Sequence, residues 1–424
     1  MNIQRKFIKY VSGSVLGMIG MSCYILADTF FIAQGVGENG LTALNLAIPV
    51  FSLITGVGLM TGIGGATLYS LNRGKNVFTQ SLYPAVIGAL LFMLCGIFFS
   101  EPLSVLLGAD EVSLRDTSAY IRIITLSAPF FILNNLVSAF VRNDNAPKTA
   151  MAAMLAGSFS NILLDYIFIF PLDWGMAGAA FATCLAPIIG LSVLSVHFIR
   201  KKNTFTLTHS APDLKKCLRI CTLGLSALIT EFSSAAVIIV FNIVILGIAG
   251  NTGVAAYGII ANIALVVVSI FTGCAQGMQP LISESRRIGD KKALRTVLAM
   301  GLGLSLVIST AVYAVSFLFA EEITALFNSE NSPVLAETAA RGIRLYFTSY
   351  FACGLNIIVS ASLSAADSPK GAFVLSILRG FALLIPTTLI LASLFALDGV
   401  WLSVTVSECV CAVLSAVLLR KIVK

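Results

Sequence analysis

Residues 78–100 read FTQSLYPAVIGALLFMLCGIFFS and contain no charged side chain. A helix that crosses a bilayer needs about 20 consecutive apolar residues, so this stretch predicts one membrane span. The rest of the chain has the same character: of 424 residues, 58% are hydrophobic and 11% are charged, whereas a soluble domain carries about 25% charged residues. This composition excludes a soluble enzyme, a disordered chain and a coiled coil. The long unbroken runs also argue against a membrane β-barrel, whose strands alternate in polarity over about ten residues.

Further apolar runs of spanning length lie on both sides of this stretch. The runs cover residues 10–33, 41–70, 78–100, 117–141, 149–170, 175–199, 217–249, 254–282, 293–320, 339–366, 371–396 and 398–419. The sequence therefore predicts an all-α polytopic membrane protein with twelve transmembrane helices and short connections. The first run is long and contains Asp28, which argues against a cleaved signal peptide.

The basic residues predict the orientation of these spans. Of the 27 Lys and Arg residues, four lie toward one side of the predicted membrane: Arg115, Arg122, Arg341 and Arg344. Arg379 falls inside a span, and all the others share the opposite side, which is the bias that marks the cytoplasm. We therefore predict a protein of the cell (inner) membrane with both termini and the mid-chain connection in the cytoplasm. In this setting the net charge of +7 does not indicate binding to nucleic acid.

Two short motifs recur at an offset of about half the chain. Residues 37–40, GENG, recur as residues 250–253, GNTG, and residues 145–148, NAPK, recur as residues 367–370, DSPK. Six spans separate the two copies, and because this number is even both halves keep the same orientation in the membrane. Parallel repeats of this kind occur in transporters, where the substrate site lies between the halves.

The repeat predicts the domain organisation. We expect two pseudo-symmetric six-helix lobes, residues 1–199 and 217–424, joined by a polar and basic cytoplasmic linker at residues 200–216. This architecture favours a transporter over a receptor or an intramembrane enzyme.

Acidic residues inside predicted spans are candidates for function, because a charge in the bilayer is costly. They are Asp28, Asp165, Glu231 and Glu408. Asn161 and Asp165 are four residues apart and share one helix face. With Asp28 and the hydroxyl of Thr183 they form a set of oxygen atoms suited to Na⁺. A proton is the alternative ligand, because burial or a neighbouring like charge favours the neutral acid, and a purely structural hydrogen-bonded pair is the third possibility.

The acidic pair belongs to one half only, since Asn161 and Asp165 align with Leu383 and Thr387 in the repeat. Glu231 is a further candidate for coupling. For Glu408 and Arg379 a structural role is favoured, with Arg379 as a candidate partner of a carboxylate.

No nucleotide-binding loop of the form G-x-x-x-x-G-K-[ST] is present, and there is no room for a nucleotide-binding domain. We therefore expect an ion gradient, rather than an ATPase subunit, to supply the energy.

Several stretches resemble the MATE (multidrug and toxic compound extrusion) transporters. They are residues 142–148 (RNDNAPK), 160–170 (SNILLDYIFIF), 174–183 (WGMAGAAFAT) and 276–280 (QGMQP), with Arg379 and Pro386. The resemblance covers nearly the whole chain. It implies two six-helix lobes around a central cavity, and alternating access driven by inward Na⁺ or H⁺.

The resemblance also implies a cation site. According to this resemblance, four residues match the cation site in the first lobe of family members that have one: Asp28, Asn161, Asp165 and Thr183. That site also uses a polar residue of the fourth helix, for which Asn134, Asn135 and Ser138 are candidates. Glu231 is similar to the acid of members that couple through the second lobe, but their partner aspartate is replaced here by Asn356.

The sequence therefore predicts a cation-coupled antiporter that exports amphipathic, often cationic, organic compounds through the lipid bilayer. It is not expected to be an enzyme, to have catalytic residues, to need a cofactor, or to bind any metal beyond Na⁺. The alternatives are a flippase for lipid-linked saccharides and a gated channel.

Overall fold

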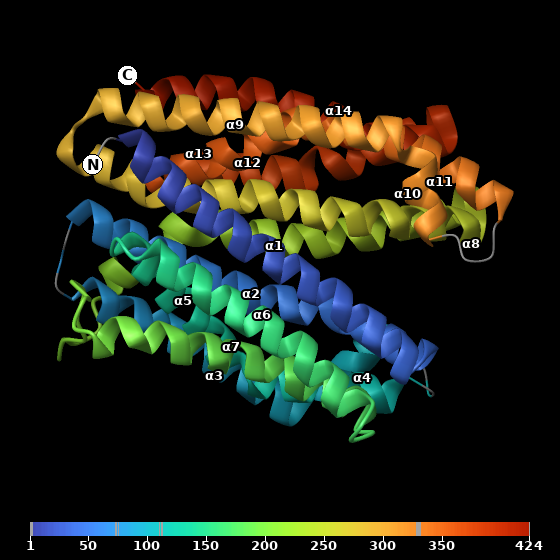
Figure 1. Ribbon diagram of the computed structural model, residues 1–424, viewed down its shortest axis with the longest axis horizontal. Coiled ribbons are helices and arrows are strands. Elements are labelled where there is room, and N and C mark those ends of the chain that lie inside the picture. The colour runs from blue at the N-terminus through green and yellow to red at the C-terminus, as the bar shows by residue number, and fades with distance from the viewer. Residues whose placement is uncertain are drawn as a thin grey trace. The chain divides into compact units, whose positions relative to one another are not determined.

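The computed structural model describes residues 3–72, 74, 76–109, 111, 113–327 and 332–423, and these residues are almost entirely helical, with no strand among them. The elements are α1 Ile3–Gly35, α2 Glu38–Asn72, α3 Val77–Leu106, α4 Leu114–Leu126, α5 Ala128–Asn143, α6 Pro147–Ile169, α7 Gly175–Ile199, α8 Leu214–Ile288, α9 Lys291–Leu318, α10 Ala320–Phe327, α11 Pro333–Tyr346, the 3₁₀ turn η1 Phe347–Ser349, α12 Tyr350–Ala365, α13 Pro369–Ile377, the π turn η2 Leu378–Ala382 and α14 Leu384–Val423 (Figure 1). Each predicted apolar run corresponds to one of these helices, to a part of one, or to consecutive helices joined at a bend or a short turn.

The described helices supply the predicted number of spans. Ten segments are long and apolar enough to cross a membrane, with α8 counted twice because its backbone leaves helical geometry at Gly250. Helices α4 and α5, bent by 47° at Ser127, together form an eleventh. The segment Pro369–Arg420 contains a second break, at Ala396 with φ 50°, and so corresponds to two predicted spans. The twelve-helix fold is confirmed.

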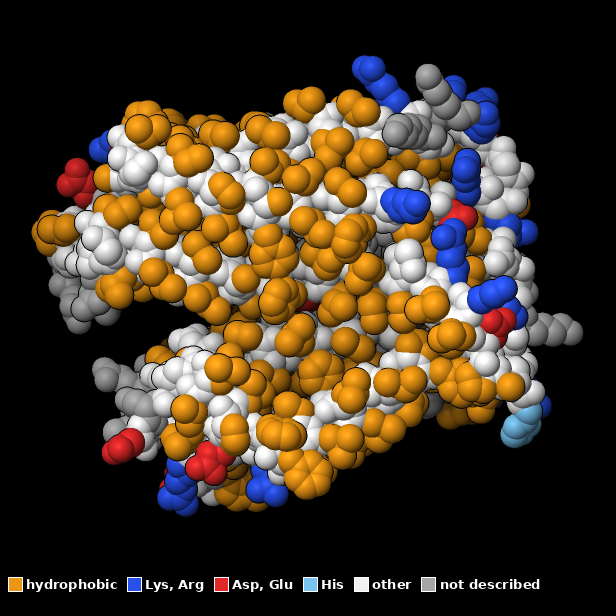
Figure 2. All heavy atoms as spheres, turned by 180° about the vertical axis from the view of Figure 1, so that it is seen from behind, with side chains coloured by type: hydrophobic (Ala, Val, Ile, Leu, Met, Phe, Trp, Pro, Cys, Tyr) orange, Lys and Arg blue, Asp and Glu red, His pale blue; other side chains and the backbone are white. Residues whose placement is uncertain are grey.

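Large apolar side chains lie on the outside of the helices. On α3, Leu91 is 63% exposed, Phe98 67% and Leu106 81%. Figure 2 shows hydrophobic side chains over much of one face, with most of the visible Lys and Arg side chains gathered at one end. An apolar surface of this extent is unfavourable in water but favourable in lipid. The chain is therefore a multi-pass membrane protein.

The internal repeat is visible in the backbone. Residues with positive φ recur in pairs: Gly37 (87°) with Gly250 (60°), Asn145 (63°) with Asp367 (65°), and Asp173 (49°) with Ala396 (50°). The offsets are 213, 222 and 223 residues. A left-handed backbone conformation is uncommon for residues other than glycine, so its recurrence at matching positions confirms that the two halves share one fold.

The chain divides into two compact units, the amino-terminal unit Arg5–Phe232 and the carboxy-terminal unit that contains Ser233–Lys424. The division falls inside α8, whose first turns pack within the amino-terminal unit: a Cβ at Gly224 would meet the backbone of Met60 on α2. The lobe ranges 1–199 and 217–424 stay a prediction about the halves of the sequence.

The connection between α7 and α8, residues 200–213, is bound along the end of the amino-terminal unit, and we call it the linker strap. Phe205 is 1% exposed and contacts the rings of Tyr69, Phe78, Phe140 and Phe198. One aromatic side chain in an otherwise polar stretch therefore inserts into the core of this unit.

Hydrogen bonds hold the linker strap on either side of Phe205. The backbone N–H of Thr204 donates to Asp144 Oδ2 at 2.8 Å, and His197 Nε2 lies 2.9 Å from the same oxygen. Further along, Gln80 Nε2 donates to the carbonyl of Ala211 at 2.8 Å and Tyr83 Oη donates to the carbonyl of Ser210 at 2.6 Å. The strap thus moves with the amino-terminal unit.

We expect Asp144→Ala to release the linker strap. The substitution removes the carboxylate that accepts from the Thr204 N–H and pairs with the buried ring of His197, at a cost of about 1–3 kcal/mol. Hydrogen exchange of the backbone amides at residues 203–211, measured by mass spectrometry, should become about tenfold faster or more. The matched control is Leu207→Ala, since Leu207 is 72% exposed. Equal exchange in both variants and the wild type would show that Asp144 does not hold the strap.

Candidate cation site

Helix α1 packs along α6 through its glycines. The nearest contacts pair Gly13 with Met151, Gly17 with Met154, Gly20 with Leu155 and Gly35 with Ile169. The paired residue numbers differ by 138, 137, 135 and 134, and Tyr10 Oη donates to Asn145 Oδ1 at a difference of 135. The two helices therefore run parallel in a nearly constant register. Differences of 134 to 138 place Asp28 level with residues 162–166, a range that includes Asp165.

Helix α7 runs antiparallel to α6 on another side. A Cβ at Gly157 would lie 3.0 Å from the carbonyl oxygen of Ala186, and one at Gly178 would lie 3.0 Å from that of Phe168. The paired residue numbers add to 343 and 346, so Asn161 comes level with residues 182–185. Thr183 lies within this range and is buried. Small residues that allow close helix approach thus bring α1, α6 and α7 together at one level.

All four predicted site residues are buried: Asp28 is 6% exposed, Asn161 0%, Asp165 0% and Thr183 4%. Their polar atoms lack hydrogen-bond partners within the described protein: Asp28 Oδ1, both carboxylate oxygens of Asp165, both amide atoms of Asn161, and Thr183 Oγ1. Nearly all buried polar atoms in folded proteins have a partner, and leaving several unpaired is costly. The concentration of unpaired polar atoms at one level makes this cluster a candidate cation site. Its carboxylate, amide and hydroxyl oxygens are of the kind that bind hard cations such as Na⁺, and its carboxylates can instead bind protons.

Two tyrosines that sequence analysis did not single out lie near this cluster. The charges of Asp28 and Asp165 are close enough to act on the phenols of Tyr24 on α1 and Tyr120 on α4. Tyr24 lies four residues before Asp28, a spacing that places both on one helix face. No sequence signal pointed to Tyr120, because its position depends on the bend at Ser127.

The predicted residues of the fourth span lie outside this level. Asn134 contacts Gly190 of α7, seven residues beyond Thr183, or about 10 Å along a helix. Ser138 lies one turn further along α5. Asn135 donates to a backbone carbonyl of its own helix at 3.1 Å. Tyr120 of this span lies closer to the cluster than these three residues, near enough for the charges of Asp28 and Asp165 to act on it.

The two residues predicted for a second coupling site lie in different compact units. Glu231, on α8, is half-buried and packs against Gly56 of α2 in the amino-terminal unit. Asn356, on α12, belongs to the carboxy-terminal unit, where its amide nitrogen donates to Glu408 Oε2 at 2.6 Å and its amide oxygen accepts from Ser415 Oγ at 2.6 Å. Because Asn356 is already paired, coupling through Glu231 and Asn356 stays a prediction that no contact supports.

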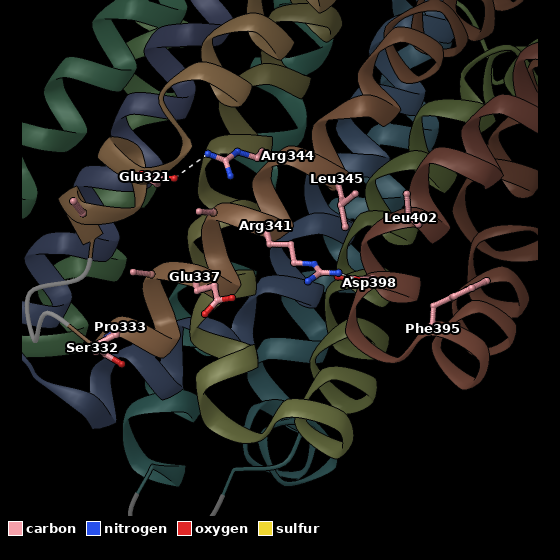
Figure 3. A pocket seen from close by; sticks show the side chains of 13 residues that line it. Glu321, Ser332, Pro333, Glu337, Arg341, Arg344, Leu345, Phe395, Asp398 and Leu402 are labelled. Atoms are coloured by element: carbon pink, nitrogen blue, oxygen red, sulfur yellow. Dashed lines mark hydrogen bonds and ion pairs between the residues drawn. The ribbon is translucent and has the colours of Figure 1, made fainter.

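A cavity of about 970 Å³ lies between α10, α11 and the middle of α14. Figure 3 shows Arg341 and Arg344 of α11 directed to opposite sides of it. Arg344 Nη2 pairs with Glu321 Oε1 at 3.0 Å, and Arg341 pairs with Asp398. These ion pairs join α11 to its neighbours, so we interpret the charged lining as structural.

Three comparisons bear on this arrangement. The sequence profile of the MatE family matches residues 14–167 and 226–414. The multidrug export protein MepA of Staphylococcus saprophyticus is 29% identical over 409 residues, which cover 94% of this chain and 89% of that protein.

Two solved structures, each 22% identical, are similar over 100% of this chain and 96% of theirs. One is the outward-facing conformation of a multidrug resistance MATE family transporter of the MOP superfamily, with a TM-score of 0.88. The other, with a TM-score of 0.89, is a MOP superfamily transporter from Pyrococcus furiosus. The reverse polarity of its binding pocket is described as suggesting a different function for that protein. At this identity the likeness shows the fold alone.

We expect Asp165→Asn to abolish stabilisation of the purified protein by cations. A ligand that binds only the folded state at a hundred times its Kd stabilises it by about 2.7 kcal/mol, so the wild type should unfold at a higher temperature in Na⁺ than in choline, or at lower pH. The control is Asp173→Asn, at an exposed carboxylate of the same unit. If Asp165→Asn responds to Na⁺ and pH like the control, the cluster is not the cation site.

Proposed function

Because the chain belongs to the MatE family, we propose that it is an antiporter that exports amphipathic, often cationic, organic compounds in exchange for Na⁺ or H⁺. Coupling to an ion is supported by the buried cluster of unpartnered polar atoms around Asp28 and Asp165. The proposed class of substrate is supported by the similarity to the multidrug export protein MepA.

The cluster links ion binding to the position of α1. Two buried carboxylates without a basic partner repel each other, and a bound cation or proton removes the repulsion and allows α1 and α6 to approach. The glycines of α1 already allow close packing against α6, so a change in the spacing of Asp28 and Asp165 is passed directly from one helix to the other. Ion binding thereby favours one conformation of the amino-terminal unit, which is the requirement for alternating access.

The energy available from one ion is sufficient for export. A charge that moves through 100 mV releases about 2.3 kcal/mol, and a tenfold concentration step costs about 1.4 kcal/mol. One coupling cation therefore drives roughly a 40-fold gradient of a neutral substrate before its own concentration gradient is added. The mechanism needs no ATPase subunit and no cofactor, and we assign no residue a catalytic role.

We place the protein in the cell membrane with both termini and the linker strap in the cytoplasm, on the basis of the distribution of basic residues. Substrates would then be taken from the cytoplasm or the bilayer and released outside.

The alternatives are less well supported. A flippase for lipid-linked saccharides needs basic groups in its cavity to bind phosphate, and the arginine within a predicted span, Arg379, is already paired with Glu408 at 2.7 Å. A gated channel would not need a cation cluster to reset a conformational cycle.

We expect efflux of a cationic dye from proteoliposomes to follow an imposed Na⁺ or pH gradient, and imposing the two gradients separately identifies the ion. Asp165→Asn should reduce coupled efflux to the rate of empty liposomes, and Asp173→Asn should leave it unchanged. Coupled efflux at the wild-type rate in a folded Asp165→Asn variant would remove the assignment. Electrical recording of the same preparation should show no unitary conductance, because discrete current steps identify a channel.

The orientation predicts that the linker strap is reached from the cytoplasm. Leu207 is 72% exposed, so Leu207→Cys should react with a membrane-impermeant maleimide in inside-out vesicles and stay unmodified in intact cells. The wild type, with its own cysteines, provides the background. Labelling of intact cells alone would reverse the orientation.

A further inference from the structure

The carboxy-terminal unit contains a second buried carboxylate, and its surroundings are the opposite of those of the cation cluster. Glu408 lies in the last span and is 8% exposed. Arg379 Nε lies 2.9 Å from its Oε2 and Arg379 Nη2 lies 2.7 Å from its Oε1. A two-pronged pair of this kind is the strongest neutralisation that a side chain can give a carboxylate.

The remaining bonding capacity of this group is also filled. Asn356 Nδ2 donates both to Glu408 Oε2 at 2.6 Å and to the backbone carbonyl of Glu408 at 2.9 Å. Ser415 Oγ donates to Asn356 Oδ1 at 2.6 Å, which orients the amide. Neither carboxylate oxygen of Glu408 is among the unpartnered buried atoms of the described chain, whereas both of Asp165 are.

A local irregularity of the backbone positions the side chain of Arg379. Arg379 lies in the π turn η2, Leu378–Ala382, which the i+5 hydrogen bond from the N–H of Leu383 to the carbonyl of Leu378 closes at 3.0 Å. A π turn inserts one residue into a helix and is frequent at functional sites. The next residue, Gly380, admits the side chain of Ser233 from α8 of the same unit. The insertion and the glycine together position Arg379 against the last span.

The internal repeat shows which residues of the amino-terminal half correspond to Arg379, Asn356 and Glu408. The offset of 222 residues relates Arg379 to Gly157 and Asn356 to Asn134, and the offset of 223 relates Glu408 to Leu185. In the amino-terminal unit this layer is closed by packing, with Gly157 against the carbonyl of Ala186. The arginine–carboxylate pair therefore exists in one half only, as does the empty acidic cluster in the other.

We propose that Arg379 is a tethered cation: its guanidinium permanently fills a monovalent-cation site formed by Glu408 and oriented by Asn356 and Ser415, so that the carboxy-terminal unit takes up no coupling ion. Removal of the guanidinium exposes a latent site for Na⁺ or a proton at Glu408. The consequence for ion coupling, that all of it runs through the amino-terminal unit, rests on the function proposed above, but the existence of the filled site does not.

The test is made in an Asp165→Asn background, which removes the first cation cluster. Thermal unfolding is measured in Na⁺ against choline, and from about pH 7.5 to about pH 5.5. The other titratable groups facing Glu408 are Cys353, Cys411, Tyr346 and Tyr350, and such groups ordinarily titrate well above pH 7. Histidines and other carboxylates elsewhere in the protein are common to all the chains compared, so the difference in response between chains reports on the Glu408 carboxylate.

Three variants are compared. The single variant carries Asp165→Asn, the double variant adds Arg379→Gln, and the triple variant adds Glu408→Gln as well. We expect the unfolding temperature of the single variant to be insensitive to ions. That of the double variant, the second, should rise by about 2 °C or more with Na⁺ or acid, and that of the triple variant should be insensitive again. A second variant without any ion response overturns the proposal. If it folds only in Na⁺ or acid, the proposal is supported. If neither restores folding, the pair is a packing element and the proposal fails.

Arg379→Lys is the conservative control and should remain insensitive, since it keeps a tethered positive charge. If the unfolding temperature of Asp165→Asn alone still rises with Na⁺ or acid, that result counts against the proposed amino-terminal site. The additional rise in unfolding temperature on adding Arg379→Gln would still decide the role of Arg379. In transport, the Arg379→Gln and Glu408→Gln double variant should keep the wild-type ratio of ions to substrate. Loss of one ion per cycle would show that Glu408 is itself a coupling group and would overturn the proposal.

Discussion

The high cost of an ionised group in an apolar interior governs the chemistry of this protein. Every buried charge has to be neutralised, and the two halves of the chain do so in different ways. In the carboxy-terminal unit the charge of Glu408 is neutralised by Arg379, a side chain of the protein itself. In the amino-terminal unit Asp28 and Asp165 lie level with each other, with unpaired oxygen atoms on both, and we propose that a cation or a proton from outside neutralises them. Under this proposal only the second arrangement makes the conformation depend on the surrounding ions.

Much of the fold was predictable because the bilayer constrains sequence strongly. An apolar run of about 20 residues has few alternatives to a helix, and each such run corresponds to observed helix. The interruptions were predictable only in part. The bend at Ser127 and the 3₁₀ turn Phe347–Ser349 occur at matching places of the repeat, 222 residues apart. Pro129, at the second position of α5, removes a backbone donor next to the first break. Residues 346–350 contain no proline or glycine, so no sequence signal marked the second break.

The candidate site was predictable in part. Spacing along α6 placed Asn161 and Asp165 on one face, but it could not state which residues of other helices lie level with them. That depends on register between helices, which became visible only through contacts such as that of Gly17 with Met154. For the same reason Tyr120 was missed. The linker strap was expected to be polar and basic, and it is, but its attachment depends on backbone groups bonded by distant side chains such as Asp144, and only the isolated Phe205 hinted at it.

The recurring left-handed residues have a consequence for the origin of the chain. Six helices return the polypeptide to the side on which it began, so a duplicated gene segment joins in frame to its copy without inversion. Two separate, identical halves would have had to carry the same residues at every position. A single polypeptide is free of that restriction: an arginine in one half leaves the other half untouched, and the different roles proposed for Asp165 and Arg379 are not available to a dimer of identical chains.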